Sequence, residues 1–220
     1  MKRLLLLCAA LVAMVSASAQ SEFGAYYDCR LAAHQKEGMP TGAVVWIGDS
    51  ITEQAWWGFL TKERPLVNRG IGGDNTRGML ARLPEILESS PRKIFFMGGV
   101  NDISGNRPVE EIASNIRKML EMIREKAPSC EVYVQSVVTP NNEVLAYPYI
   151  KNKQPQTREL NARLKAMCDE GLATWVDLTK LLHNEQDELR EEYTKDGIHL
   201  HPEAYVVWVN HLKKMKYLRK

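Results

Sequence analysis

A serine at a strand-to-helix turn is the first residue of this sequence that could do chemistry. In Gly48-Asp49-Ser50 it follows a short apolar run. Its backbone N–H would therefore be one of the unpaired donors at a helix start, and its hydroxyl would face a cleft. Asp and Ser are also ordinary helix N-caps, so the tripeptide alone leaves both interpretations open. A serine hydroxyl becomes a good nucleophile only when a base removes its proton.

The histidine best suited to be that base is His199, in Asp196-Gly197-Ile198-His199. A carboxylate bonded to the other ring nitrogen of a histidine fixes its tautomer and stabilises the imidazolium. Read alone, the segment is also compatible with a turn that carries a solvated histidine. Together with Ser50, it predicts a triad in which Ser50 is the nucleophile, His199 the base and Asp196 its orienting partner. Structural or solvated roles are expected for the other downstream histidines, which have no carboxylate at comparable spacing in a short loop: His183, His201 and His211.

Acyl transfer also needs hydrogen-bond donors aimed at the oxyanion of the tetrahedral intermediate. The glycine turn at residues 70–73 offers backbone N–H groups with no side chain in the way, and Gly73 is the best placed. Asn101 lies in a glycine-flanked loop and can present its side-chain amide. The alternatives are a turn that requires positive φ and a loop cap. We predict an oxyanion hole made by the Ser50 N–H, the Gly73 N–H and the Asn101 amide.

The elements that must position these residues alternate regularly along the chain. Strands are predicted at residues 43–47, 65–68, 93–97, 131–138 and 174–176, of which 43–47 and 93–97 are expected to be buried. Helices are predicted at residues 50–60, from 75 or 76 to a break or restart at Pro84, and at 108–126, 156–170 and 202–217. Residues 20–40 read as a polar lead-in. Such alternation indicates a parallel sheet covered on both faces, with functional groups in the loops at the carboxyl ends of its strands.

Four short segments resemble the four blocks of the SGNH (GDSL-type) hydrolases, in the family's order: Gly48-Asp49-Ser50, Gly70-Ile71-Gly72-Gly73-Asp74, Gly99-Val100-Asn101-Asp102 and Asp196-Gly197-Ile198-His199. The resemblance covers about residues 43–215, and residues 68–76 are especially similar to acetylhydrolases of the platelet-activating-factor acetylhydrolase type. It implies an α/β fold, a flavodoxin-like three-layer sandwich with a central five-stranded parallel sheet. It also implies a serine esterase that uses no metal or cofactor, with the triad and oxyanion hole named above.

The first 19 residues are expected to be a signal peptide rather than part of the domain. A basic start at Lys2-Arg3 precedes an apolar run at residues 4–15 and the small residues Ala17-Ser18-Ala19. An N-terminal core helix and a lipid anchor at Cys8 are the alternatives. We therefore expect residues 20–220 to form a single domain that is exported to the periplasm or the extracellular space. No second apolar run is long enough to predict a membrane span.

Charge and cysteine content exclude some partners and leave others open. Removing Lys2 and Arg3 lowers the number of basic residues from 29 to 27, which equals the 27 acidic residues. The formal net charge is then zero, so the charge balance does not indicate binding to nucleic acid. The spacing of Cys29, Cys130 and Cys168 suits no zinc site, and one disulfide is possible in an oxidising compartment. The oligomeric state is not evident from the sequence.

The substrate is indicated only by coarse features. Export and the lack of a lid insertion favour small O-acyl groups, most of all O-acetyl groups on carbohydrates such as sialic acid or a polysaccharide. Trp57 is a candidate for a substrate contact, although core packing is the commoner fate of such a residue, and Asp74 is a second candidate. A lysophospholipase or thioesterase of the same fold is the enzymatic alternative. The alternative from another class is a carbohydrate-binding protein without turnover.

Overall fold

The computed structural model describes residues 20–219 and contains a five-stranded, wholly parallel sheet with the strand order β2-β1-β3-β4-β5. Its strands are β1 (Val44–Gly48), β2 (Leu66–Gly70), β3 (Lys93–Met97), β4 (Glu131–Gln135) and β5 (Thr174–Val176). Strand β1, which lies between β2 and β3, is buried along its whole length, as expected for a strand covered on both faces. The predicted fold class is confirmed. The predicted signal peptide lies outside the described residues.

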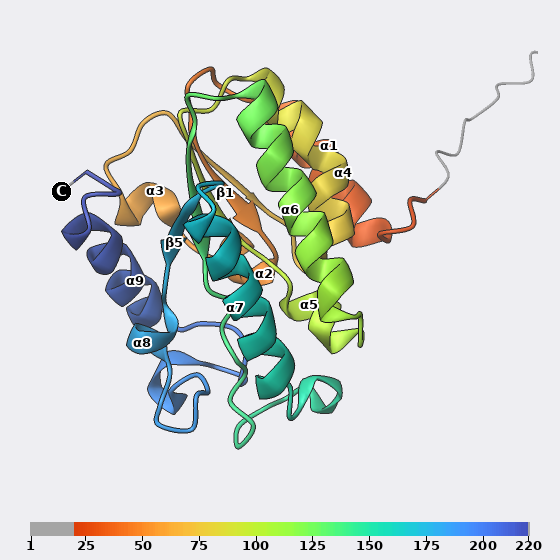
Figure 1. Cartoon of the computed structure of the whole chain (residues 1–220), viewed down its shortest axis with the longest axis vertical. Helices are drawn as coiled ribbons and strands as arrows, with labels where there is room; N and C mark the ends of the chain where they lie inside the picture. Colours follow the sequence, from red (N-terminus) through yellow and green to blue (C-terminus); the bar gives the residue numbers. More distant parts are fainter. Residues whose placement is uncertain (1–19, 220) are drawn as a thin grey trace, which may run out of the picture.

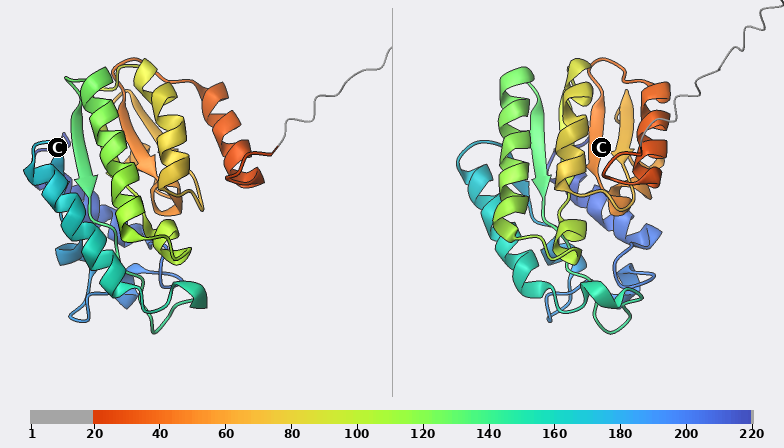
Figure 2. Two further views of the ribbon diagram at one scale, coloured as in Figure 1. Left: turned by 45° about the vertical axis from the view of Figure 1, so that its right-hand side comes forward. Right: turned by 90° about the vertical axis from the view of Figure 1, so that its right-hand side faces the viewer.

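Helices cover both faces of the sheet, so the molecule has three layers (Figure 1). The longer helices are α1 (Ala25–Glu37), α4 (Thr76–Glu88), α6 (Val109–Lys126), α7 (Gln154–Asp169) and α9 (Pro202–Lys214). The short ones are α2 (Ser50–Glu53), α3 (Trp57–Leu60), α5 (Val100–Ser104) and α8 (Thr179–Leu182), with 3-10 turns at Pro148–Ile150 and Glu191–Tyr193. The views in Figure 2 show α4, α6 and α7 on one face and α9 on the other, with α1 beside α4.

The longest helix follows its predicted pattern closely. In α6 the apolar positions that recur at helical spacing are buried against the sheet, among them Ile112, Ile116 and Ile123. Glu110 and Glu111 lie in its first turn and Arg124 and Lys126 in its last, where their charges complement the helix dipole. Amphipathic spacing and end charges therefore agree, and the prediction for this helix is confirmed.

An aromatic cluster fills the layer between β1 and α9. The Trp46 and Trp57 rings stack with their centroids 3.5 Å apart, and Trp208 meets both of them edge-on. The Trp57 indole N–H donates to the Thr52 carbonyl at 3.0 Å, so its polar atom is satisfied inside the core. This cluster anchors the helices next to Ser50 to the sheet.

Several predicted elements differ from the structure: β4 and α9 each end three residues earlier than predicted, and three other regions differ more. Residues 50–60 form two short helices, α2 and α3, because the chain leaves helical geometry between Glu53 and Trp57. Helix α4 runs through Pro84 without ending, since tertiary packing of its buried face outweighs the one lost backbone hydrogen bond. Residues 20–40, predicted as a polar lead-in, contain α1. Its apolar stripe is weak, with only Tyr27 and His34 buried.

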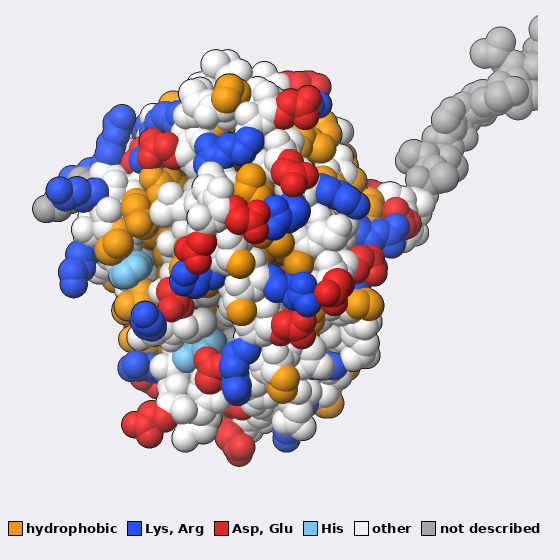
Figure 3. Space-filling view, viewed as in Figure 1, with side chains coloured by type: hydrophobic (Ala, Val, Ile, Leu, Met, Phe, Trp, Pro, Cys, Tyr) orange, Lys and Arg blue, Asp and Glu red, His pale blue; other side chains and the backbone are white. Residues whose placement is uncertain are grey.

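The surface carries both signs of charge. Figure 3 shows basic and acidic side chains interspersed over the visible face rather than gathered by sign. Many of them form ion pairs between helices, such as the bidentate contact of Arg117 on α6 with Glu170 at the end of α7. Within the described residues, no helix is both long enough and apolar enough to span a membrane.

Candidate active site

Ser50, His199 and Asp196 form one continuous hydrogen-bonded chain. The Ser50 hydroxyl lies 2.9 Å from His199 Nε2, and His199 Nδ1 lies 2.7 Å from Asp196 Oδ2. The neutral histidine tautomer that fits both partners carries its proton on Nδ1, donates it to the carboxylate and accepts the serine hydroxyl at Nε2. Such a chain can move the serine proton to the histidine while Asp196 holds the ring. Ser50 and His199 are 149 residues apart in sequence and meet only in the fold.

The loop before α9 holds Asp196 in its ionised form. Burial raises the pKa of Asp196, but this is outweighed by hydrogen bonds from the His199 N–H at 2.8 Å, the Ile198 N–H at 3.1 Å and the His199 ring, so the net pKa is lowered. The same carboxylate thus shapes the loop with one oxygen and orients the imidazole with the other. Sequence spacing alone had indicated that the two side chains could meet.

A second loop, residues 139–154, packs against the segment that contains Asp196 and His199. The Asn141 N–H donates to the Gly197 carbonyl at 2.8 Å, and the Ala146 N–H donates to the Asp196 carbonyl at 2.9 Å. Gly197 has φ of +88°, and a Cβ placed on it would lie 2.6 Å from Leu145 Cα. Only glycine satisfies both the conformation and the close approach. The loop also brings the Tyr147 ring to 6.0 Å from the His199 ring, edge to face.

The predicted oxyanion turn lies directly against the nucleophile. A Cβ built on Gly72 would be 3.8 Å from Ser50 Cβ, and the Asp74 N–H donates to the Ile71 carbonyl at 3.1 Å to close the turn. Gly73 occupies the position with φ of +76°, which glycine adopts without strain. Among the described residues, no hydrogen bond takes up the N–H of Ser50 or of Gly73. Both donors therefore remain free for an oxyanion.

Asn101 sits in α5 rather than in an open loop. Its side-chain Nδ2 donates to the Asp74 carbonyl at 2.8 Å, which ties the helix to the glycine turn. An amide nitrogen has two N–H bonds, so the second remains for a ligand. The structure thus brings the three predicted oxyanion donors to neighbouring strand ends, after β1, β2 and β3.

Asp49, next to the nucleophile, is fully buried. Its Oδ1 accepts the Ile51 N–H at 2.9 Å, while Oδ2 has no hydrogen-bond partner among the described residues. Burial raises the pKa of Asp49 to about 7, with smaller contributions from the carboxylates of Asp74 and Asp102. Sequence reasoning treated this residue only as a helix cap, and its burial could not be read from the tripeptide.

The two weaker substrate contacts need correction. Trp57 is 1% exposed and stacks inside the core, because the break between α2 and α3 turns it away from the cleft. Asp74 is 3% exposed and bonds to the Arg82 guanidinium at 3.0 Å. Arg82 also donates to the carbonyls of Gly48 and Arg69, so this pair joins the ends of β1 and β2. In these positions neither Trp57 nor Asp74 offers its side chain to a ligand.

Sequence reasoning missed an aromatic groove beside the triad. A cavity of about 610 Å³ opens between α3 and α9, and it is lined by Trp56 and Phe59, which are 74% and 89% exposed. At its rim the Lys195 ammonium donates to Gln54 Oε1 at 2.7 Å. Gln54 is one helical turn after Ser50, and Lys195 precedes Asp196, so the groove adjoins the site. The adjacent tryptophans Trp56 and Trp57 were the only sequence feature that pointed to this groove. The sequence did not show that Trp56 is exposed and Trp57 is buried.

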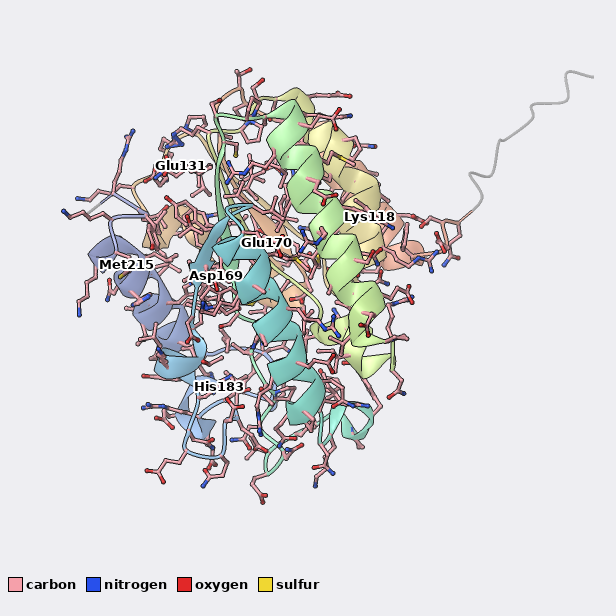
Figure 4. All side chains as sticks on the ribbon, viewed as in Figure 1. Lys118, Glu131, Asp169, Glu170, His183 and Met215 are labelled. Atoms are coloured by element: carbon pink, nitrogen blue, oxygen red, sulfur yellow. The ribbon has the colours of Figure 1, made fainter. Side chains whose placement is uncertain are left out.

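His183 has a carboxylate partner that sequence reasoning did not find. Its Nδ1 lies 2.9 Å from Asp187 Oδ1, and its Nε2 accepts the Thr139 N–H at 3.0 Å. Both ring nitrogens are therefore occupied, and burial lowers the pKa of His183 despite the nearby carboxylates. Figure 4 labels His183 at the end of the molecule where α8 and the loops after the strands gather. The expected structural role fits this arrangement.

Within residues 20–219, no three His, Cys, Asp or Glu side chains are grouped so that they could hold a metal ion. The cysteines at positions 29, 130 and 168 carry free thiols, the first exposed and the other two buried. Burial raises the pKa of Cys130 to about 12 and of Cys168 to about 11, so neither is a nucleophile at neutral pH.

Comparisons with known proteins agree with this geometry. Residues 46–207 match the sequence model of the GDSL-like lipase/acylhydrolase family. The chain is 30% identical to a GDSL esterase/lipase of Arabidopsis thaliana over 73% of its own length and 79% of the relative's. It is 28% identical to the isoamyl acetate-hydrolyzing esterase 1 homolog of Mus musculus, over 72% and 75%. The crystal structure of a GDSL-like lipase from Bacteroides thetaiotaomicron superposes with a TM-score of 0.74 and 25% identity, covering 87% of this chain and 98% of that one.

Proposed function

The chain belongs to the GDSL-like lipase/acylhydrolase family, and we propose that it is an exported serine esterase that removes O-acetyl groups from carbohydrates. The observation that carries the proposal is the unbroken chain of hydrogen bonds from Ser50 through His199 to Asp196. A serine in that arrangement has a base within reach, and the base has an orienting carboxylate.

In the proposed mechanism, the Ser50 oxygen attacks the ester carbonyl while His199 Nε2 takes the hydroxyl proton. The carbonyl oxygen becomes an oxyanion, and His199 then gives its proton to the departing alcohol as the C–O bond breaks. Water attacks the resulting acyl-Ser50, again losing a proton to His199. Acetate leaves, and the proton returns to the serine oxygen.

The oxyanion forms where free donors converge. Ser50 and Gly73 offer backbone N–H groups, and Asn101 offers its second amide N–H. Donors fixed before the reaction cost no reorganisation when the charge develops. Asp196 stabilises the imidazolium without itself becoming protonated, in keeping with its lowered pKa.

The proposed substrate class rests on the groove beside the triad. The exposed indole of Trp56 and ring of Phe59, inclined at 47° to each other, give an apolar surface, and Gln54 and Lys195 place polar groups at its rim. Sugar rings combine apolar C–H faces with hydroxyl edges, so they suit such a surface. A small acyl group is supported by the mouse relative, whose name records hydrolysis of an acetate ester.

The first experiment separates an esterase from a binding protein. Wild type is expected to hydrolyse p-nitrophenyl acetate, and Ser50→Ala is expected to lose at least about 10⁴-fold in kcat, because the nucleophile acts together with its base. A wild type no faster than Ser50→Ala would sink the esterase proposal.

A second experiment addresses the substrate. Acetate release from a panel of acetylated glycans, sialic acid and xylan among them, should identify the carbohydrate. Trp56→Ala should raise KM for the glycan and leave p-nitrophenyl acetate unaffected, with Met215→Ala, an exposed apolar residue at the end of α9, as the matched control. A rate that rises from acetate to octanoate esters would favour a lysophospholipase or thioesterase instead.

Export is proposed from the order of basic, apolar and small residues in the first 19 positions. Sequencing the amino terminus of protein recovered outside the cytoplasm should show that the chain begins at Gln20. A protein that retains Met1 and stays in the cytoplasm would contradict the proposal.

A further inference from the structure

We propose that Glu53 is a positioning residue for the oxyanion turn, and that helix α1 completes the esterase site by holding Glu53 in place. The inference rests on the proposed function, because it assigns Glu53 a role in the same reaction. Neither Glu53 nor any residue of α1 was indicated by sequence motifs, and neither would touch the ester itself.

The geometry places one carboxylate between two segments that are far apart in sequence. Glu53 Oε2 accepts the Gly72 N–H at 2.6 Å. Its other oxygen, Oε1, accepts the Tyr26 hydroxyl at 2.9 Å and lies 2.5 Å from the Arg30 Nε. The Glu53 side chain is 14% exposed, so these contacts are partly shielded from water. One oxygen thus holds the turn and the other is held by α1.

The turn needs such a contact because two adjacent glycines give it little stiffness. Gly72 and Gly73 can adopt several backbone conformations at small cost, and these point the Gly73 N–H in different directions. The closing bond from the Asp74 N–H to the Ile71 carbonyl restrains the ends of the turn. The Glu53 carboxylate restrains the peptide at its first corner. An oxyanion donor acts at full strength only when its direction is set in advance.

The ion pair with Arg30 also has an electrostatic consequence. Glu53 follows Ser50 by three residues and sits beside the turn where negative charge would develop. An uncompensated carboxylate there would oppose the oxyanion, whereas the Arg30 guanidinium balances it. Arg30 therefore both fixes the position of Glu53 and offsets its charge.

The test compares steady-state kinetics on p-nitrophenyl acetate. Glu53→Ala should lower kcat about 10- to 100-fold and change KM less than about threefold, since the turn acts on the transition state more than on the bound ester. Glu53→Gln should recover much of the loss, because its amide oxygen can still accept the Gly72 N–H. Arg30→Ala should lower kcat in wild type and add nothing further to Glu53→Ala.

Two readouts distinguish positioning from a merely structural effect. The acid limb of the pH profile of kcat should not move in Glu53→Ala, because His199 and Asp196 are untouched. The control is Glu85→Ala, which removes another contact between α1 and the body, the bond from Gln35 Nε2 at 3.1 Å, without touching the turn. It should keep the wild-type kcat.

The inference is overturned if Glu53→Ala keeps kcat within twofold of wild type, or if Glu85→Ala loses as much. A fall that appears only where circular dichroism or the melting temperature shows unfolding also overturns it; Arg30→Ala provides a milder variant should Glu53→Ala fold poorly. A wild type as slow as Ser50→Ala would instead refute the proposed function. The two failures are therefore separable.

Discussion

At the scale of single residues, the chemistry depends on which atoms of ordinary side chains are left free. Asp196 shows this, because its carboxylate accepts the His199 ring at 2.7 Å and two backbone N–H groups at once. Asp196→Asn should therefore keep the loop but lower kcat about 10³- to 10⁴-fold, since an amide neither stabilises the imidazolium nor enforces its tautomer. Steady-state kinetics with unchanged melting temperature would check it. A loss under tenfold would contradict a role for this carboxylate.

Asp49 makes a prediction about stability rather than rate. Burial raises its pKa to about 7 from an ordinary value near 3.8, so the native state holds a proton that the unfolded chain releases. Stability then falls as the pH rises through the interval between these two values. Asp49→Asn removes the ionisation while its Oδ1 can still accept the Ile51 N–H. Relative to wild type, the variant should gain stability between pH 5 and pH 8, on the order of 1 kcal/mol or more.

Denaturant unfolding of both proteins at the two pH values would measure this difference. If the variant instead lost stability relative to wild type between pH 5 and pH 8, Asp49 would be ionised in the native state. The same measurement on Asp187→Asn, whose side chain is 35% exposed, gives a control at a carboxylate that water still reaches.

Sequence reasoning succeeded for some residues and failed for others, for physical reasons. Ser50, Asp196 and His199 could be proposed because each chemical role demands a particular residue type at a turn. Trp57 could not be placed, because the break after Glu53 depends on packing against α9 and not on local preference. Glu53 carries no motif at all, and only the fold shows that it faces Gly72.

At the scale of elements, the contact between the loop of residues 139–154 and the loop that carries residues 196–199 has the tightest steric requirement of the site. Gly197 combines φ of +88° with the close approach of Leu145. Gly197→Ala should destabilise the fold by about 2–4 kcal/mol and displace His199, because the new Cβ must push one loop away from the other. The expected kcat loss should exceed that of Gly171→Ala, which also has positive φ but has open space around it. Melting curves and kinetics on both variants would decide the matter.

Elements were predicted correctly where the local sequence pattern agrees with the tertiary packing, and missed where it does not. Strands β3 and β5 and helix α6 were predicted within a residue, because apolar runs and amphipathic spacing are local properties. Helix α1 was missed because it is attached mainly by polar contacts, such as that of the Tyr27 hydroxyl with the Gly78 carbonyl. Helix α5 was predicted as a loop, since it has only about one turn and the residue before it is Gly99.

At the scale of the whole molecule, the fold is held without cross-links in the part that the structure describes. Cys29 is exposed, and Cys130 and Cys168 are buried thiols. In a chain that begins at Gln20, one thiol should react quickly with Ellman's reagent in the native state and all three after unfolding. Reducing agent should leave the melting temperature unchanged. A shift on reduction would reveal a disulfide.

The 149 residues that separate Ser50 from His199 have a practical consequence. A cut at the exposed turn around Gly171, between α7 and β5, would leave the nucleophile on one fragment and its base on the other. Neither fragment could turn over an ester by this chemistry, so colour from a chromogenic substrate would appear only on reassembly. The architecture is thus suited to a split reporter, in which each fragment is fused to one of two interacting proteins and hydrolysis is restored when those proteins bind each other.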